Sequence, residues 1–99
     1  MALTGKQRRY LRGLAHNKQP VLAIGHNNLS KAVLAELEIV LNDHELIKIK
    51  LPEIDARARK ALIEQLCAES GAGFVQLIGR IAVVYRQGEK NRIELPDQT

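Results

Sequence analysis

The sequence has few aromatic side chains and no tryptophan: Tyr10, Phe74 and Tyr85 are all it contains. An RRM-like surface, which stacks RNA bases on several strand aromatics, is therefore excluded. The single cysteine, Cys67, cannot form an internal disulfide. The sequence also has no cluster of His, Cys, Asp or Glu with the spacing of metal ligands, so we expect neither a metal nor a cofactor.

Long apolar segments are absent as well. No run approaches the roughly 20 residues of a membrane span, and no hydrophobic signal core follows the first residues. The 99 residues, 45% apolar and 26% charged, suit a single domain spanning residues 1–99. We expect a cytoplasmic monomer with no membrane partner.

Acidic residues are missing from the first 35 positions, because the first carboxylate is that of Glu36. This segment has a net charge of +6, whereas residues 36–99 have −2, for a total of +4. Its cations are Lys6, Arg8, Arg9, Arg12, Lys18 and Lys31. Such a concentration of positive charge favours a polyanionic partner, most commonly nucleic acid. RNA, DNA and an acidic protein all stay open, as does a merely solvated helix face.

Three helices are predicted, and each begins at an N-cap residue: Thr4, Ser30 or Asp55. They extend to about residues 16, 43 and 70. In the first helix, Leu3, Leu11 and Leu14, with Tyr10 beside them, form the apolar side, and Lys6, Arg8, Arg9, Arg12 and His16 lie on the other side. The first helix thus presents a cationic face.

Four strands are predicted, at residues 21–24, 45–51, 74–78 and 81–85, and the last two form a hairpin across Gly79-Arg80. In the second strand Lys48 and Lys50 alternate with Ile47 and Ile49, so we expect the face that carries the lysines to be open to water.

The element order is α-β-α-β-α-β-β. Strands joined through a helix are parallel and the final hairpin is antiparallel, which gives a four-stranded mixed sheet of the α/β (α+β) type. We expect both crossover helices on one face, and hence two layers.

Several segments resemble the CRM domain (chloroplast RNA splicing and ribosome maturation), and in particular its free-standing bacterial members. These segments are a helix-strand-Gly-x-x-x-Leu-Ser-helix pattern, Val33-Leu34-Ala35-Glu36-Leu37-Glu38, His44-Glu45-Leu46-Ile47-Lys48-Ile49-Lys50, Val75-Gln76-Leu77-Ile78-Gly79 and Val83-Val84-Tyr85-Arg86. The resemblance covers about residues 3–96. It implies a fold similar to the C-terminal domain of translation initiation factor three, with strand order 1-2-4-3.

The same resemblance implies RNA binding and, for one-domain bacterial members, association with rRNA in precursors of the large ribosomal subunit. The family's Gly-x-x-Gly loop begins here at Gly25, but Asn28 stands where the second glycine is expected. Asparagine enters the left-handed region more readily than most residues, so the loop shape can survive. We predict positive φ at Asn28 or a neighbouring loop residue.

The predicted RNA-binding residues are cations and loop residues from the first 31 positions: Lys6, Arg8, Arg9, Arg12, Lys18, Gly25, His26, Asn27, Asn28 and Lys31. Lys48 and Lys50 are further candidates on the sheet, and Arg86 matches a family position. The enzymatic alternative is a small RNA hydrolase that uses His26. No motif supplies it with a second catalytic group, so we expect a protein that is not an enzyme.

Overall fold

The computed structural model describes residues 2–26 and 29–96. Its elements are α1 Gly5–Ala15, β1 Pro20–Ala23, α2 Lys31–His44, β2 Leu46–Lys50, α3 Ala56–Ser70, β3 Gly73–Ile78 and β4 Ile81–Tyr85. The predicted helices and strands are all present, with small differences at their ends.

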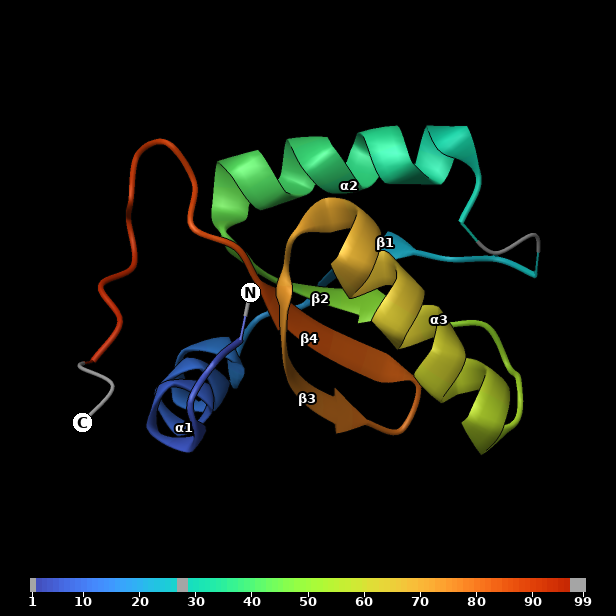
Figure 1. Ribbon diagram of the computed structural model, residues 1–99, viewed down its shortest axis with the longest axis horizontal. Helices are drawn as coiled ribbons and strands as arrows, with labels where there is room; N and C mark the ends of the chain where they lie inside the picture. The colour runs from blue at the N-terminus through green and yellow to red at the C-terminus, as the bar shows by residue number, and fades with distance from the viewer. Residues whose placement is uncertain (1, 27–28, 97–99) are drawn as a thin grey trace.

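The four strands form one mixed sheet in the order β1-β2-β4-β3 (Figure 1). β1 and β2 are parallel, whereas β4 is antiparallel to both of its neighbours. The hairpin turn has Gly79 at φ 57°, a conformation that glycine adopts without strain. This confirms the α+β fold and the strand order that the resemblance implied.

The helices lie on both faces of the sheet, and Figure 1 shows α1 and α2 on opposite sides of it. On one face, Leu37 of α2 and Leu66 of α3 are buried with Ile47 and Ile49. The other face has its own core, in which α1 packs over β2, β3 and β4. That second cluster consists of Leu3, Leu11, Ala15, Leu46, Val75, Val83 and Tyr85.

The prediction of two layers was therefore wrong. Leu46 points to the same side as the lysines of β2, and it is buried there with Val83 and Tyr85. The apolar side of α1 covers these residues, which gives three layers. Lys48 is half-buried as a result, and only Lys50 is fully exposed.

The predicted N-caps are confirmed. The side chains of Thr4, Ser30 and Asp55 accept hydrogen bonds from the third backbone N–H of their helices, at 3.1, 3.1 and 2.8 Å. Thr4 belongs to a complete capping box, because its own N–H donates to Gln7 Oε1 at 3.0 Å. The register of α1 differs from the prediction: Gln7 is buried, whereas Leu14 and Tyr10 are 41% and 43% exposed.

The segment after β4 has no helix or strand as far as residue 96, yet it is held to the domain. Its Ile93 and Leu95 pack against the cluster beneath α1, as the sequence suggested. The buried carboxylate of Glu45 accepts hydrogen bonds from the backbone N–H groups of Arg92 and Ile93, at 2.9 and 3.2 Å. Glu45 itself ends α2 with φ 64°, without a glycine at this position.

Candidate nucleic-acid interface

The exposed side of α1 carries the cations that the sequence predicted. Lys6, Arg8, Arg9 and Arg12 are all exposed, and the first turn of the helix contains no acid. Arg8 also donates from Nη1 to the carbonyl of Leu3, at 2.8 Å. The buried stripe through Leu11 fixes the helix on the sheet and turns these cations toward solvent.

α1 covers only part of its face of the sheet. The helix ends at Ala15, above the middle of β2, so the far ends of the strands stay open beyond it. On this uncovered part, Ile78 is 52% exposed. The result is a step between the end of α1 and the open sheet.

Two adjoining hollows lie at this step, and both are lined by His16, Lys48 and Ile78. One of them also includes Arg12 and Gln76, and the other includes Lys18. We call the two together the sheet groove. No carboxylate lines either hollow among the residues that the structure describes.

Lys48 connects the two sides of the sheet groove. Its Nζ donates to the carbonyl of His16, at 3.4 Å, where α1 has just ended. A cation at this position offsets the negative end of the helix dipole, which would otherwise repel an anion. The groove is thus positive although a helix C-terminus points toward it.

The Gly25 loop begins beside the open sheet. The N–H of Ile24 donates to the carbonyl of Lys50, at 2.8 Å, so Gly25 and His26, which follow β1, begin beside the end of β2. Both residues are exposed. Asn27 and Asn28, and with them the prediction of positive φ at Asn28, lie outside the described residues.

Lys31 is exposed at the first position of α2, on the side of the sheet opposite to α1. The Ser30 hydroxyl already accepts the N–H of Val33, so the helix start is capped from within the chain. The structure thus brings Arg12, Lys18 and Lys48 together, and places Lys31 apart from them.

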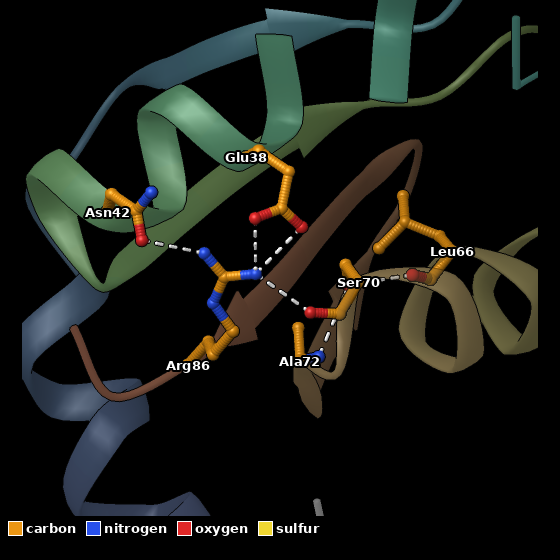
Figure 2. A network of polar contacts seen from close by, with 6 residues as sticks. All are labelled: Glu38, Asn42, Leu66, Ser70, Ala72 and Arg86. Atoms are coloured by element: carbon orange, nitrogen blue, oxygen red, sulfur yellow. Dashed lines mark hydrogen bonds and ion pairs between the residues drawn. The ribbon is translucent and has the colours of Figure 1, made fainter. Parts of the chain in front are cut away.

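Arg86 lies in a different environment. Figure 2 shows its guanidinium between α2 and the end of α3, where Nη2 donates to Asn42 Oδ1 at 2.8 Å. Nη1 donates to the carbonyl of Ser70 at 2.9 Å and forms an ion pair with Glu38 at 2.8 Å. These contacts hold α2, α3 and β4 together, and we leave Arg86 out of the candidate interface.

Two other hollows have a different character. One, of about 610 Å³, lies between α3 and β3 and is lined by the apolar Phe74 and Leu77 together with the charged Lys60 and Glu64. The hollow beside His26 is lined by aliphatic residues and Gln65, and its described lining contains no second acid or base. In the described part of the chain, no three His, Cys, Asp or Glu residues are grouped to hold a metal, and no helix could span a membrane.

The sequence did not indicate three contacts that shape this molecule. They are the buried carboxylate of Glu45, the Arg86 network, and a hydrogen bond from Gln7 Nε2 to the carbonyl of Pro96 at 3.3 Å. Each joins residues far apart in the chain, and each residue is of a type that is usually exposed. The spacing of Thr4 and Gln7 is a local signal for the capping box that positions the Gln7 side chain. It is no signal for the bond from Gln7 to Pro96.

These features define a small three-layer α+β domain with a cationic helix and a basic groove on one face. Residues 3–86 match the model of the CRS1/YhbY (CRM) domain. The chain belongs to the CRM family.

Proteins of several bacteria are similar over nearly the whole chain. A Pseudomonas aeruginosa protein named as a probable RNA-binding protein is 48% identical over 90 residues, which cover 91% of this chain and 86% of the relative. A Haemophilus influenzae protein named as an RNA-binding protein is 45% identical and covers 95% of both chains. The solution structure of a Staphylococcus aureus protein, described as a candidate RNA-binding protein, has a TM-score of 0.84 at 39% identity, covering 95% of this chain and 99% of that one.

Proposed function

We propose that this protein binds RNA, chiefly through the phosphate backbone. The observation that carries the proposal is the acid-free segment of residues 1–35, with a net charge of +6. Its cations on α1 are exposed, and Arg12 and Lys18 line a groove in whose described lining there is no carboxylate. The similar proteins named for RNA binding support this choice of polyanion over DNA or an acidic protein.

Backbone recognition follows from the residue types. Arginine and lysine on an exposed helix reach phosphates, which position a nucleic acid without reading its sequence. Tyr10, on α1, is the one aromatic side chain of that helix, so a row of stacked bases is not available there. The proposed contacts are those of α1, Lys18, the Gly25 loop from Gly25 to Asn28, Lys31, and Lys48 and Lys50 on the sheet.

We propose further that the RNA is rRNA in precursors of the large ribosomal subunit, as the family resemblance implies, and that the protein acts there as a cytoplasmic monomer and assembly factor. Sedimentation of a cell extract through a gradient after low-salt lysis tests this. The protein is expected with particles that contain large-subunit precursors. Recovery with free soluble protein alone would contradict the assembly role but not RNA binding.

The proposed activity is binding without catalysis. His26 is exposed, and among the described residues that line the hollow beside it there is no general acid or base partner. Incubation with labelled RNA is expected to give no cleavage by either the natural protein or His26→Ala. Cleavage that disappears in His26→Ala would establish the hydrolase instead.

A further inference from the structure

The floor of the sheet groove is apolar, which backbone binding alone does not require. Ile78, with 52% of its surface exposed, lies in both hollows, and Ile81 beside it is half-buried. Their strands are adjacent, with Ile78 directly opposite Ile81. A phosphate gains nothing from this surface, because an ion prefers water to an aliphatic contact.

The walls of the groove differ sharply from its floor. Arg12 lies on α1, Lys18 lies in the turn after α1, and Lys48 lies on β2. Cations therefore flank the isoleucines on more than one side. Gln76, half-buried in the same wall, adds an amide that can both donate and accept hydrogen bonds. The apolar floor suits the face of a base, and the cations around it suit the phosphates. The amide suits the hydrogen-bonding edge of the base.

We infer that the sheet groove binds unpaired nucleotides, with a base against Ile78 and Ile81 and its flanking phosphates at Arg12, Lys18 and Lys48. This inference rests on the proposed RNA binding and specifies its substrate class as single-stranded RNA. The base edge faces Gln76, while α1 follows the backbone outside the groove.

The dimensions of the groove agree with this assignment. Its two hollows measure about 360 and 310 Å³, at the lower end of the roughly 300–1,000 Å³ typical of sites for small ligands. A base that is paired and stacked in an A-form duplex cannot enter such a hollow, because the duplex offers only its backbone and a shallow minor groove. The groove should therefore discriminate single strands from duplexes, whereas α1 should not.

The test compares Ile78→Ala with Ile39→Ala, which shortens an isoleucine that is 54% exposed on α2. Fluorescence anisotropy measures the affinity of each folded variant for a labelled oligouridine and for an oligoadenine–oligouridine duplex of equal length. We expect Ile78→Ala to weaken oligouridine binding about five- to tenfold, because the base then covers less apolar surface, and to leave duplex binding unchanged. Ile39→Ala should change neither.

A change in the RNA gives a second test, which does not depend on whether Ile78→Ala folds. Oligouridine with abasic positions should bind the natural protein more weakly than intact oligouridine does, and Ile78→Val should reduce that difference without unfolding the chain. Equal effects of Ile78→Ala on single strand and duplex, or no effect on either, would overturn the inference while salt-dependent RNA binding persisted. Failure of the natural protein to bind either RNA would instead remove the proposed function.

Discussion

Arg86 and Glu38 are joined by a bifurcated contact: Nη1 of the arginine donates to both carboxylate oxygens, at 2.8 and 2.9 Å (Figure 2). The two residues lie at the end of β4 and in the middle of α2, so the contact fixes that helix to the sheet. The arginine side chain is only 19% exposed, and its guanidinium also donates to Asn42 and to the carbonyl of Ser70. Arg86, which the family resemblance makes a further candidate for RNA contact, therefore connects α2, α3 and β4.

Replacing Arg86 should destabilise the fold and leave RNA binding intact. Arg86→Ala removes hydrogen bonds to Glu38, Asn42 and the carbonyl of Ser70, and we expect a loss of about 1–2 kcal/mol in the free energy of unfolding. The figure is modest because Glu38 is 51% exposed and its ion pair is screened by water.

Urea unfolding measures the loss, and anisotropy on the folded protein measures the affinity. Glu38→Gln retains a hydrogen-bond acceptor and should cost less than Arg86→Ala. If folded Arg86→Ala lost as much RNA affinity as an Arg12 variant does, Arg86 would belong to the RNA interface after all.

Replacing Gly88 with alanine should weaken the hydrogen bonds that hold the segment after β4 to Glu45. A Cβ at Gly88 would lie 3.0 Å from Oε2 of Glu45 and 3.2 Å from the backbone carbonyl of Asn42. Because the Glu45 carboxylate binds the N–H groups of Arg92 and Ile93, Gly88→Ala should displace it and speed hydrogen exchange at both amides.

Gly13→Ala is the matched control for this substitution. A Cβ at Gly13 meets nothing within 4 Å, and alanine is the better helix former. We expect Gly13→Ala to raise stability by about 0.5–1 kcal/mol and to leave the tail amides protected. Unchanged exchange at Arg92 and Ile93 in Gly88→Ala would contradict the role given to Glu45.

Stability should fall at alkaline pH through the buried phenol of Tyr85 and the half-buried thiol of Cys67. Burial raises the pKa of the Tyr85 phenol, and the charge of Glu45 raises this pKa further; burial also raises the pKa of the Cys67 thiol. The folded state therefore holds these protons more tightly than the unfolded chain does. Their contribution is complete below the ordinary pKa values, about 8.5 for cysteine and 10 for tyrosine, and is lost as pH rises through the folded values.

The urea midpoint, followed from neutral pH to about pH 11, measures this loss. Tyr85→Phe keeps the buried ring and removes the phenol, so its midpoint should decline less steeply at the alkaline end than that of the natural protein. Parallel declines would show that Tyr85 does not titrate with folding.

The sequence predicted the elements well because their signals are local. Caps such as Ser30, alternation in β2 and the glycine of the β3–β4 turn each act within a few residues. The position of α1 was not predicted, because the need to cover Leu46, Val83 and Tyr85 arises only after the strands have paired. The groove depends on the same event, since it exists only where α1 ends above the sheet.

The candidate site was predicted in part for a similar reason. A run of cations without acids is visible in the sequence, so the α1 face could be proposed from it. The sequence cannot separate Lys48, which lines the groove, from Arg86, which is occupied by α2 and α3. Both are basic residues on strands or at their ends, and only their neighbours in space distinguish them.

If α1 binds RNA phosphates, RNA affinity should depend on salt concentration through the arginines of α1. The variant reverses the charge of Arg8, Arg9 and Arg12 to glutamate. The control reverses Arg57, Lys60 and Lys90, which are also exposed and change the net charge equally. Circular dichroism checks folding, because Arg8 also binds the Leu3 carbonyl.

For the natural protein, the logarithm of the binding constant should fall linearly with the logarithm of salt concentration, with a slope of about −0.7 for each phosphate neutralised on a single strand. The α1 variant should bind unrelated RNA sequences more weakly by similar factors, and its slope should be shallower by about 2. The control should retain most of the affinity and the slope. Equal losses in the two variants, or losses that depend strongly on RNA sequence, would contradict phosphate binding by α1.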